Sequence, residues 1–500
     1  MTYRRLNYSA QLNYSNTFGK HTVGAMGNFS REQYSTGSDS PHYRENWVFR
    51  ATYDFARRYM LEYNGAYNGS EIFSKENRFA FFNSGAIGWM VSEEAFMKPL
   101  VEKRIIDMLK LRASYGEIGD DHVKQGRWLF RDTWTNSGNV RPGSVASGGN
   151  PDFAKSSYTW WQLSQEGNPD LHWEKATKFD AAVDFSFLGG LITGSFDYFK
   201  ENRTDILIDG SERAVPSYYG GNAPDANLGK VKSSGYELDV RFNKQLNSNL
   251  RLWGSLAITH AKNIIQERDD PKLTPEYQKR AGKTIGQTYT YLDYGYYNNW
   301  DELYGSTAHD EYDDNRMPGN YIILDYDADG VISLNDNIPY GFSNIPQNTY
   351  NFQIGFDWKG WSAFVQFYGT NNVSRSVSLQ SLADNRTSGY FEGSYWTADN
   401  QNADVPLPRW SSDAKASQYT NGTRFMFDGS YLRLKYAEIS YTFSKEKWLK
   451  AAGLQNLKLY VNGNNLALWT DMPDDRESNT GGWSAYPTQR RFNIGLRVTL

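Results

Sequence analysis

The sequence predicts an all-β protein, folded as a transmembrane antiparallel β-barrel. Apolar and polar residues alternate with a period of two in many segments of about ten residues, as in strands with one lipid-facing and one lumen-facing side. The connections between these segments are alternately short and long. Aromatic residues make up 16% of the chain although the mean hydropathy is only −0.70, which suits aromatic girdles at two membrane interfaces.

The stretch 352–368 shows the alternation most clearly. Every second residue from Phe352 to Trp358 is apolar, and so is every second residue from Trp361 to Phe367. Lys359 and Gly360 between them have the length and composition of a two-residue hairpin turn. The sequence therefore predicts a hairpin with a tryptophan on each side of its turn.

The other segments with this alternation bring the expected total to about fifteen strands. In chain order they are 6–16, 21–32, 44–55, 57–68, 78–92, 106–118, 174–187, 191–202, 231–244, 248–262, 430–443, 456–464 and 489–500. No long helix is predicted, and a short helical stretch is expected in SEEAFMKPLVEKRI, residues 92–105.

The long connections are predicted to be extracellular loops. They cover residues 119–173, 203–230, 263–347, 371–429 and 465–488, whereas the connections between them are tight turns such as LGG and KG. An outer-membrane barrel has short periplasmic turns and long extracellular loops. The alternative is a soluble all-β protein such as a propeller or a lectin, in which alternation is equally expected.

The strand count indicates whether the predicted strands form a complete barrel. If the short turns are periplasmic, the first strand starts outside the cell and the fifteenth ends in the periplasm. Closed bacterial barrels have an even number of strands, and outer-membrane transporters with a plugged lumen have about 22. We therefore expect further strands before residue 1. The N-terminus has no apolar segment of a signal peptide, which also favours a fragment.

Charge and residue usage exclude several functions. The net charge of −4 gives no indication of nucleic-acid binding, and the absence of cysteine excludes disulfides and thiolate metal sites. The chain has six histidines and no nucleophile elbow. His172 and Glu174 alternate on a predicted strand and do not form a helical zinc-binding motif. The sequence therefore predicts that the chain is not an enzyme.

The stretch DYDADGVISLND, residues 325–336, has the register of a calcium loop of the EF-hand type. Such a loop supplies oxygen ligands from positions 1, 3, 5, 7, 9 and 12, with glycine at position 6. Here the ligands would be Asp325, Asp327, Asp329, the Val331 carbonyl, Ser333 and Asp336. No helical pattern flanks the loop, so we expect a structural Ca²⁺ site rather than a sensor. The alternative is a solvated acidic turn.

Aromatic residues in the long loops are candidates for contact with a ligand or a partner. Exposed rings can stack on sugars or bury a large area at small entropic cost. The candidates are Trp134, Tyr158, Trp160, Trp161, Tyr218, Tyr219, Tyr296, Tyr297, Trp300 and Trp396. The alternative for each is packing within the loops or a place in the outer aromatic girdle.

Several blocks make the chain resemble the C-terminal barrel portion of a SusC/RagA-type TonB-linked outer-membrane transporter of Bacteroidetes. They include LKLRASYGEIG, GNPDLHWEKATKFDAAVDFSFLGGLITGSFDYFKENRTDIL, ANLGKVKSSGYELDV, YLRLKYAEISYTF and LKLYVNGNNLALWT. The resemblance implies a multi-pass barrel in the cell outer membrane with its plug domain outside these residues.

The resemblance also implies active import of a large nutrient, an oligosaccharide or a peptide. The expected partners are a SusD-like surface lipoprotein over the long loops, TonB acting through an N-terminal region that these residues lack, and the lipid bilayer. Two alternatives stay open: a soluble or surface glycan-binding β-protein without transport, and a non-functional barrel fragment.

Overall fold

The computed structural model describes most of the chain. The described residues are 3–37, 40–121, 127–139, 159–220, 223–310, 316–376, 395–403, 406–407, 422–444, 446–451, 453–472 and 488–500. Among them, no helix is long and apolar enough to cross a membrane.

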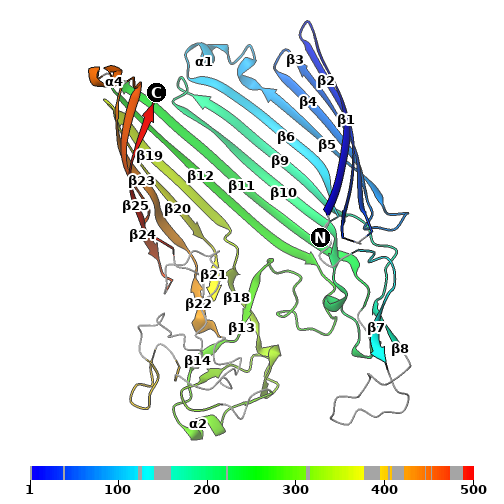
Figure 1. The fold of residues 1–500 in the computed structure, drawn as a ribbon. Helices are drawn as coiled ribbons and strands as arrows, with labels where there is room; N and C mark the ends of the chain where they lie inside the picture. The colour runs from blue at the N-terminus through cyan, green and yellow to red at the C-terminus, as the bar shows by residue number, and fades with distance from the viewer. Residues whose placement is uncertain are drawn as a thin grey trace.

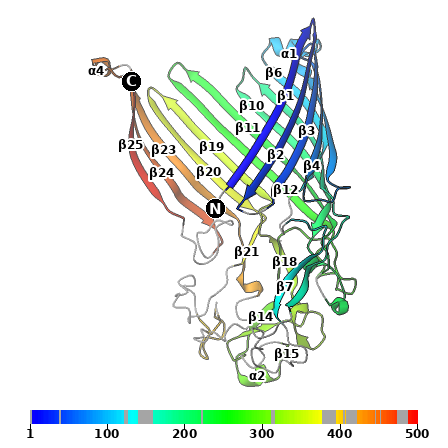
Figure 2. The same ribbon diagram turned by 45° about the vertical axis from the view of Figure 1, so that its right-hand side comes forward.

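One curved antiparallel sheet dominates the fold (Figures 1 and 2). Its fifteen strands are ordered in space as they are in sequence, so every strand pairs with its predecessor in the sheet, and β1 and β25 form the two edges. In order, they are β1 (Tyr3–Phe18), β2 (His21–Thr36), β3 (His42–Phe55), β4 (Tyr59–Ser70), β5 (Phe79–Met90), β6 (Ile106–Asp120), β9 (Glu174–Phe187), β10 (Ile192–Ile208), β11 (Ala226–Asn247), β12 (Leu250–Glu267), β19 (Asn348–Trp358), β20 (Trp361–Asn371), β23 (Tyr431–Phe443), β24 (Asn456–Thr470) and β25 (Arg491–Thr499).

Each predicted segment overlaps one of these strands, and the all-β class is confirmed. The predicted hairpin is also confirmed, because Trp358 pairs with Trp361 across the turn. Lys359 and Gly360 have φ of +48° and +89°, the left-handed backbone that a type I′ turn requires. Most connections at one end of the sheet, called here the turn end, are short turns, except for residues 91–105 and 444–455. The longest connections lie at the opposite loop end (Figure 1).

The outward face of the sheet is apolar and carries two aromatic rows. Near the turn end, Phe55, Tyr59 and Trp89 are paired side by side, and toward the loop end Trp47 pairs with Tyr67 and Tyr67 with Phe81. Aliphatic residues of the same face, such as Leu61 and Ile87, lie between the rows and are 53% and 60% exposed. This face therefore has the pattern of a lipid-facing surface between two interfacial girdles.

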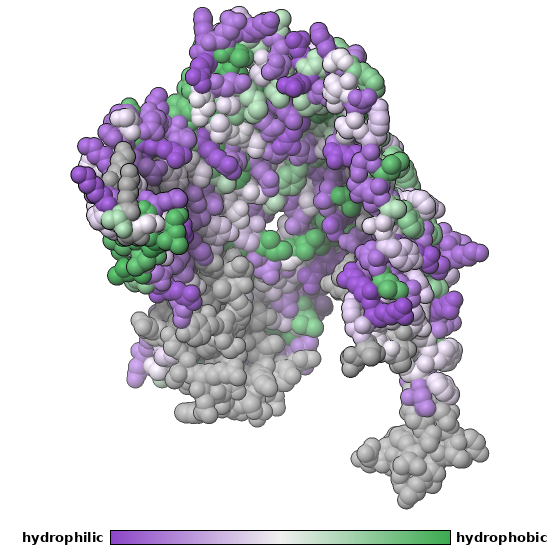
Figure 3. Space-filling model, turned by 45° about the horizontal axis from the view of Figure 1, so that its top comes forward, coloured by the Kyte–Doolittle hydropathy of each residue, from purple (hydrophilic) through white to green (hydrophobic). Residues whose placement is uncertain are grey.

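The inward face is polar. The Arg112 guanidinium forms ion pairs with Asp180, Asp184 and Asp197, carboxylates of β9 and β10 on the same face. Arg50 pairs with Glu62 in the same manner on β3 and β4. With the turn end brought forward, Figure 3 shows mostly hydrophilic side chains over the end that carries the turns.

Helices are few and short in the part of the chain that the structure describes. The predicted helical stretch is only partly helical, with a 3-10 turn at Val91–Glu93 and α1 at Lys98–Glu102. The other α-helices are α2 (Trp300–Tyr304) and α4 (Lys447–Ala451).

The loop end has secondary structure of its own. Five two-stranded sheets are formed there: β7 (Thr133–Asn139) with β8 (Thr159–Gln165), β13 (Gln287–Thr290) with β18 (Ile338–Ser343), β14 (Asp293–Tyr296) with β16 (Tyr321–Ile323), β15 (Ala308–His309) with β17 (Val331–Ile332), and β21 (Ser374–Ser376) with β22 (Met426–Asp428).

Candidate functional site

The two longest connections, 268–347 and 372–430, pack against each other at the loop end. Tyr296, Tyr321, Trp396, Ala403 and Phe425 form one buried cluster from both connections. This packing gives the loop end a fixed aromatic core and holds β14, β16 and β22 in place.

A buried ion pair strengthens this packing. The Asp293 side chain is 4% exposed, and its carboxylate accepts hydrogen bonds from Thr423 Oγ1 at 2.6 Å, Arg424 N at 2.8 Å and Arg424 Nε at 3.2 Å. The Arg424 guanidinium also lies 4.8 Å from the ring centroid of Tyr296 and donates to its hydroxyl at 3.0 Å. Because Asp293 and Arg424 lie in different connections, this pair fixes their relative position.

The acidic loop 325–336 is folded as a tight turn around its carboxylates. The Asp325 carboxylate accepts a hydrogen bond from Gly330 N at 2.9 Å, and Gly330 has a φ of +87° that favours glycine. The Asp336 carboxylate accepts from Tyr326 N at 2.6 Å and from Ser333 N at 2.8 Å. These bonds bring the first and last acidic residues of the motif together.

Carboxylate oxygens of Asp325, Asp327 and Asp336 lie within 4.8 Å of one another. Asp336 is fully buried, and Asp325 Oδ1 is buried with no hydrogen-bond partner. The pKa of Asp327 is raised by burial and by repulsion from Asp329, Asp336 and Asp325. A hydrogen bond from Asp329 N opposes this effect only in part. A hard cation with oxygen ligands fits this donor set, because it would satisfy the unpartnered oxygen and neutralise the repulsion.

The other three predicted ligands are placed differently. Asp329 is not among the three clustered carboxylates, and its Oδ1 accepts from Val331 N at 2.8 Å. Ser333 Oγ accepts from Asn335 N at 3.0 Å and caps the 3-10 turn at Leu334–Asp336. Val331 pairs with Ala308 in the short parallel sheet of β15 and β17.

Two other segments of the same connection contact this loop. Tyr277 Oη donates to Asn335 O at 2.7 Å, and the neighbouring Gln278 Nε2 donates to the same carbonyl at 2.6 Å. The Tyr277 ring lies edge-on to Tyr326, with ring centroids 4.8 Å apart. The loop, which contains β17, therefore joins residues 277–278 and β15 within the connection 268–347.

The predicted loop aromatics fall into three groups. Trp134, Trp161, Tyr218, Tyr219 and Trp300 are exposed at the loop end. Tyr296, Tyr297 and Trp396 are buried among the loops. Tyr158 and the side chain of Trp160 lie outside the part of the structure that is described. Contact of these residues with a ligand or partner stays a prediction.

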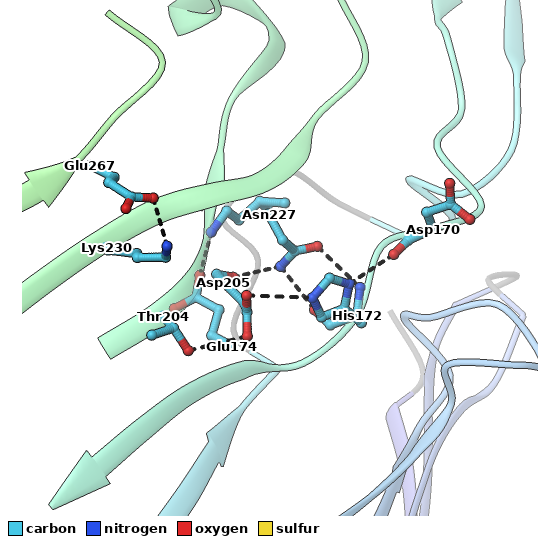
Figure 4. Close-up of polar contacts among 9 residues, drawn as sticks. Asp170, His172, Glu174, Thr204, Asp205, Asn227, Lys230 and Glu267 are labelled. Carbon is cyan, nitrogen blue, oxygen red and sulfur yellow. Dashed lines mark hydrogen bonds and ion pairs between the residues drawn. The ribbon is translucent and has the colours of Figure 1, made fainter. Parts of the chain in front are cut away.

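β10 and β11 run beyond the predicted limits, so the connection between them is 209–225 rather than 203–230. The reason is a bulge in β10 between Arg203 and Ile206 that interrupts the alternation. Asp205 has a φ of +59° in this bulge. Asn227 Nδ2 donates to the carbonyls of Asp205 at 2.7 Å and His172 at 3.0 Å (Figure 4).

His172 and Glu174 stabilise this bulge. Glu174 Oε1 accepts from Leu207 N at 3.0 Å, and His172 Nε2 lies 3.9 Å from an oxygen of Asp205. Figure 4 shows both side chains turned toward the bulge. These contacts give His172 and Glu174 a structural role in holding the bulge of β10.

Beside the bulge, a cavity of about 740 Å³ lies at the loop end on the inward side of β10, β11 and β12. Residues 280–287 fold back over it, held by hydrogen bonds from Ile265 N to Lys283 O and from Ile285 N to Asn263 Oδ1. Eight charged side chains line the cavity: Glu201, Arg203, Glu212, Lys230, Glu267, Arg268, Arg280 and Lys283.

Most of these charges are paired. Arg203 with Glu201, Lys230 with Glu267, and Arg268 with Glu212 are each separated by 2.7 Å (Figure 4 shows the second pair). The Arg280 guanidinium lies 4.2 Å from the ring centroid of Tyr289. The cavity thus offers hydrogen-bonding groups of both charges beside the aliphatic residues Ile206, Ile208 and Ile265, a combination that binds polar organic ligands.

The sequence patterns single out none of these cavity residues. The available signal is a concentration of charge at the loop ends of three neighbouring strands, in KENR at 200–203, GKVK at 229–232 and QERDD at 266–270. It becomes informative only when the strand order is known, because the three segments are far apart in the chain.

Comparison with known families decides the identity of the fold. The family model described as "TonB dependent receptor-like, beta-barrel" matches residues 2–466. The chain belongs to this family. The family consists of outer-membrane transporters and not enzymes, so the predicted location in the outer membrane is confirmed. The predicted resemblance to SusC/RagA-type transporters is confirmed by the relatives described below. The long loops of the TonB-dependent receptor barrel are therefore extracellular and its short turns periplasmic.

Individual relatives agree with this assignment. "TonB-dependent receptor P3" of Formosa agariphila is 27% identical over 481 residues, which cover 90% of this chain and 45% of that protein. "TonB-dependent receptor SusC" of Bacteroides thetaiotaomicron is 24% identical over 474 residues, which cover 90% and 43%. The chain thus spans about half the length of the curated relatives it matches.

A solved structure has the same fold. "Structure of the RagAB peptide importer in the 'open-open' state" contains a chain that superposes with a TM-score of 0.74 at 16% identity, covering all of this chain and 54% of the other. At this level of identity the comparison supports the TonB-dependent barrel fold.

Proposed function

We propose that this chain forms part of the barrel wall of an active importer for a large nutrient, an oligosaccharide or a peptide. The observation that carries the proposal is the cavity of about 740 Å³ on the inward side of the extracellular mouth. A substrate that enters the lumen passes this wall, and the cavity size lies in the range of small-molecule sites.

Two further features support this function. The loop end presents exposed aromatic rings, including Trp134, Trp161 and Tyr218, on which a substrate or a lipoprotein lid could pack. The inward strand face carries polar and charged groups such as Arg112, Asp180 and Gln353, as a transport pathway requires. We propose a SusD-like lipoprotein as the lid and TonB as the source of energy. One related structure is described as a peptide importer, which supports a peptide as one of the two substrate classes.

The edges of the sheet support a second part of the proposal. β1 and β25 are sheet edges, and an exposed edge within a membrane leaves backbone groups without partners. We propose that strands outside these 500 residues close the barrel, with a total near 22 as in plugged outer-membrane transporters.

Uptake by the source bacterium tests the importer. Cells that lack the protein should fail to take up one labelled pool of oligosaccharides or peptides, because a substrate too large for passive pores needs the importer. Lys230→Ala together with Glu267→Gln should reduce uptake about tenfold, since each removes hydrogen bonds to charged groups. Lys262→Ala, on the outward face of β12, is the matched control. Normal uptake of both pools without the protein would reject the function.

We also propose that the acidic loop 325–336 holds a structural Ca²⁺ ion. The support is the convergence of Asp325, Asp327 and Asp336, together with the unpartnered buried Oδ1 of Asp325. The ion would hold the loop against residues 277–278 and β15 and so stiffen the extracellular connection 268–347. The ligands must be deprotonated for binding.

Chelation should loosen this connection. We expect faster hydrogen exchange in residues 277–283 and 325–336 after chelation, because the acidic residues then repel one another. Asp327→Ala should abolish the response, whereas Asp301→Ala, an exposed acid in α2 of the same connection, should leave it intact. Equal exchange with and without chelator in the unaltered protein would exclude the ion.

The pH dependence of binding follows from the raised pKa of Asp327. Its carboxyl protonates above the usual value of 3.8, so calcium affinity should begin to fall above that pH as the solution is acidified. Without the ion, repulsion destabilises the loop above the pKa of Asp327 and is relieved below it. Equilibrium dialysis with Ca²⁺ between pH 3 and pH 7 measures the affinity, and a pH-independent affinity would contradict this assignment.

A further inference from the structure

A second cavity, of about 420 Å³, lies at the loop end of β2 to β5, the blue strands of Figure 1. Four arginines, Arg31, Arg44, Arg78 and Arg131, line it together with the acidic residues Glu45 and Glu71. It is separate from the inward cavity described above, which is lined by β10, β11 and β12.

The strand register places one row of the cavity lining on the outward face of the sheet, and Arg44, Ser70 and Arg78 in the adjacent row. Arg31 pairs with Glu45, Glu45 with Gly69, and Gly69 with Phe79, so these residues form one row. The adjacent row toward the turn end contains Trp47, Tyr67 and Phe81, the exposed aromatic girdle of the lipid-facing surface. The arginine cavity therefore lies just outside that girdle, at the level of the outer-leaflet headgroups.

The charges of the cavity are not balanced among the residues that the structure describes. Glu71 already has two partners, His42 and Arg127, each 2.8 Å away. The ion pair between Glu45 and Arg31 is long, at 3.9 Å, and Glu45 also accepts a hydrogen bond from Trp47 Nε1. Arg44 pairs with Asp121 at 2.7 Å. Arg78 and Arg131 have no carboxylate partner among the described residues, which leaves the lining with an excess of positive charge.

Arg78 gives a second and independent indication of a missing anion. Its Nε is buried and has no hydrogen-bond partner among the described residues. Leaving a buried charged donor unsatisfied is costly, so an acceptor is expected there. The planar guanidinium group matches the oxygens of a phosphate, which it binds with paired hydrogen bonds.

We propose that this cavity binds the phosphate headgroup of an outer-leaflet lipid. Arg78, Arg31 and Arg131 would hold the phosphate, and the acyl chains would lie along the aromatic row of Trp47, Tyr67 and Phe81. The outward row of the lining adjoins the lipid-facing aromatic girdle, which favours a lipid over a transported substrate. The lipid would fix the depth of β2 to β5 in the membrane, independently of import.

The test uses the protein as the bacterium makes it, purified from its own outer membrane. Native mass spectrometry and phosphorus analysis should find phosphorylated lipid retained by the unaltered protein. Arg78→Gln, and separately the more exposed Arg131→Ala, should reduce retention about ten- to a hundredfold, as expected for loss of a hydrogen bond between charged groups. Lys262→Ala, a cation on the outward face outside any such cavity, should retain the lipid.

Two further arms identify the source of the phosphate. Vesicles of phosphorylated lipid should bind the delipidated protein and vesicles of neutral lipid should not, and inorganic phosphate should fail to compete at millimolar concentration. Heat-modifiable gel mobility checks that each variant is folded. Unchanged lipid retention in folded Arg78→Gln and Arg131→Ala, or binding of inorganic phosphate alone, would overturn the proposal.

Discussion

Replacement of Ile354 by arginine is expected to destabilise the barrel by about 2–4 kcal/mol, the cost of a cationic side chain at the middle of the lipid-facing surface. Ile354 lies on the outward face of β19, where it pairs with Val365 and Gly254 and is 43% exposed. It is four residues from Trp358 at the turn end, about 10 Å along the axis of a tilted strand. That depth is near the centre of the apolar band.

The neighbouring residue of the same strand provides the matched control. Gln353 pairs with Gln366 on the inward face, so arginine at position 353 would point into an aqueous lumen and cost little. Urea unfolding in lipid vesicles measures the difference in free energy, and heat-modifiable gel mobility reports assembly in cells. Equal effects of Ile354→Arg and Gln353→Arg would show that the two faces are wrongly assigned.

Replacement of Asp293 by alanine should release the two longest extracellular connections from each other. Its carboxylate is buried and accepts three hydrogen bonds from Thr423 and Arg424, so its removal leaves a guanidinium without its anion. Breaking a buried pair in this way costs about 3 kcal/mol. We expect faster hydrogen exchange in residues 290–296 and 422–428, measured by mass spectrometry on the folded protein.

Two variants separate the ion pair from general effects on the loop. Asp293→Asn keeps the shape and some hydrogen bonds, so its effect should be smaller than that of alanine. Asp301→Ala, an exposed acid in α2, should change nothing. The membrane strands should stay protected from exchange in every variant. Unchanged exchange of residues 290–296 and 422–428 in Asp293→Ala would mean that the aromatic cluster alone holds the two connections together.

The strands could be predicted because their signal is local. Each of the fifteen strands of the large sheet faces lipid on one side and the lumen on the other, so apolar and polar side chains alternate along consecutive residues. The Lys359–Gly360 turn was equally readable, since its backbone angles depend on two residues. The bulge at Thr204–Asp205 was not, because its partners, Asn227 and Glu174, come from other strands.

The candidate sites differ in the same way in how far they could be predicted from the sequence. The sequence by itself determined the register of the acidic loop, because residues 325–336 are contiguous and their spacing is the signal. It also determined the family, through blocks spread over the whole chain. It did not separate exposed loop aromatics such as Trp134 from buried ones such as Trp396, because burial depends on packing between two connections.

Only the tertiary structure decided where charges from distant segments meet. Arg31 and Arg78 line one cavity, and Arg203 and Lys283 line another, because the sheet places the ends of neighbouring strands side by side. Charged residues are common where a single strand meets a loop. It becomes a binding surface when the fold closes several such ends around one cavity and leaves a buried donor such as Arg78 Nε without a partner.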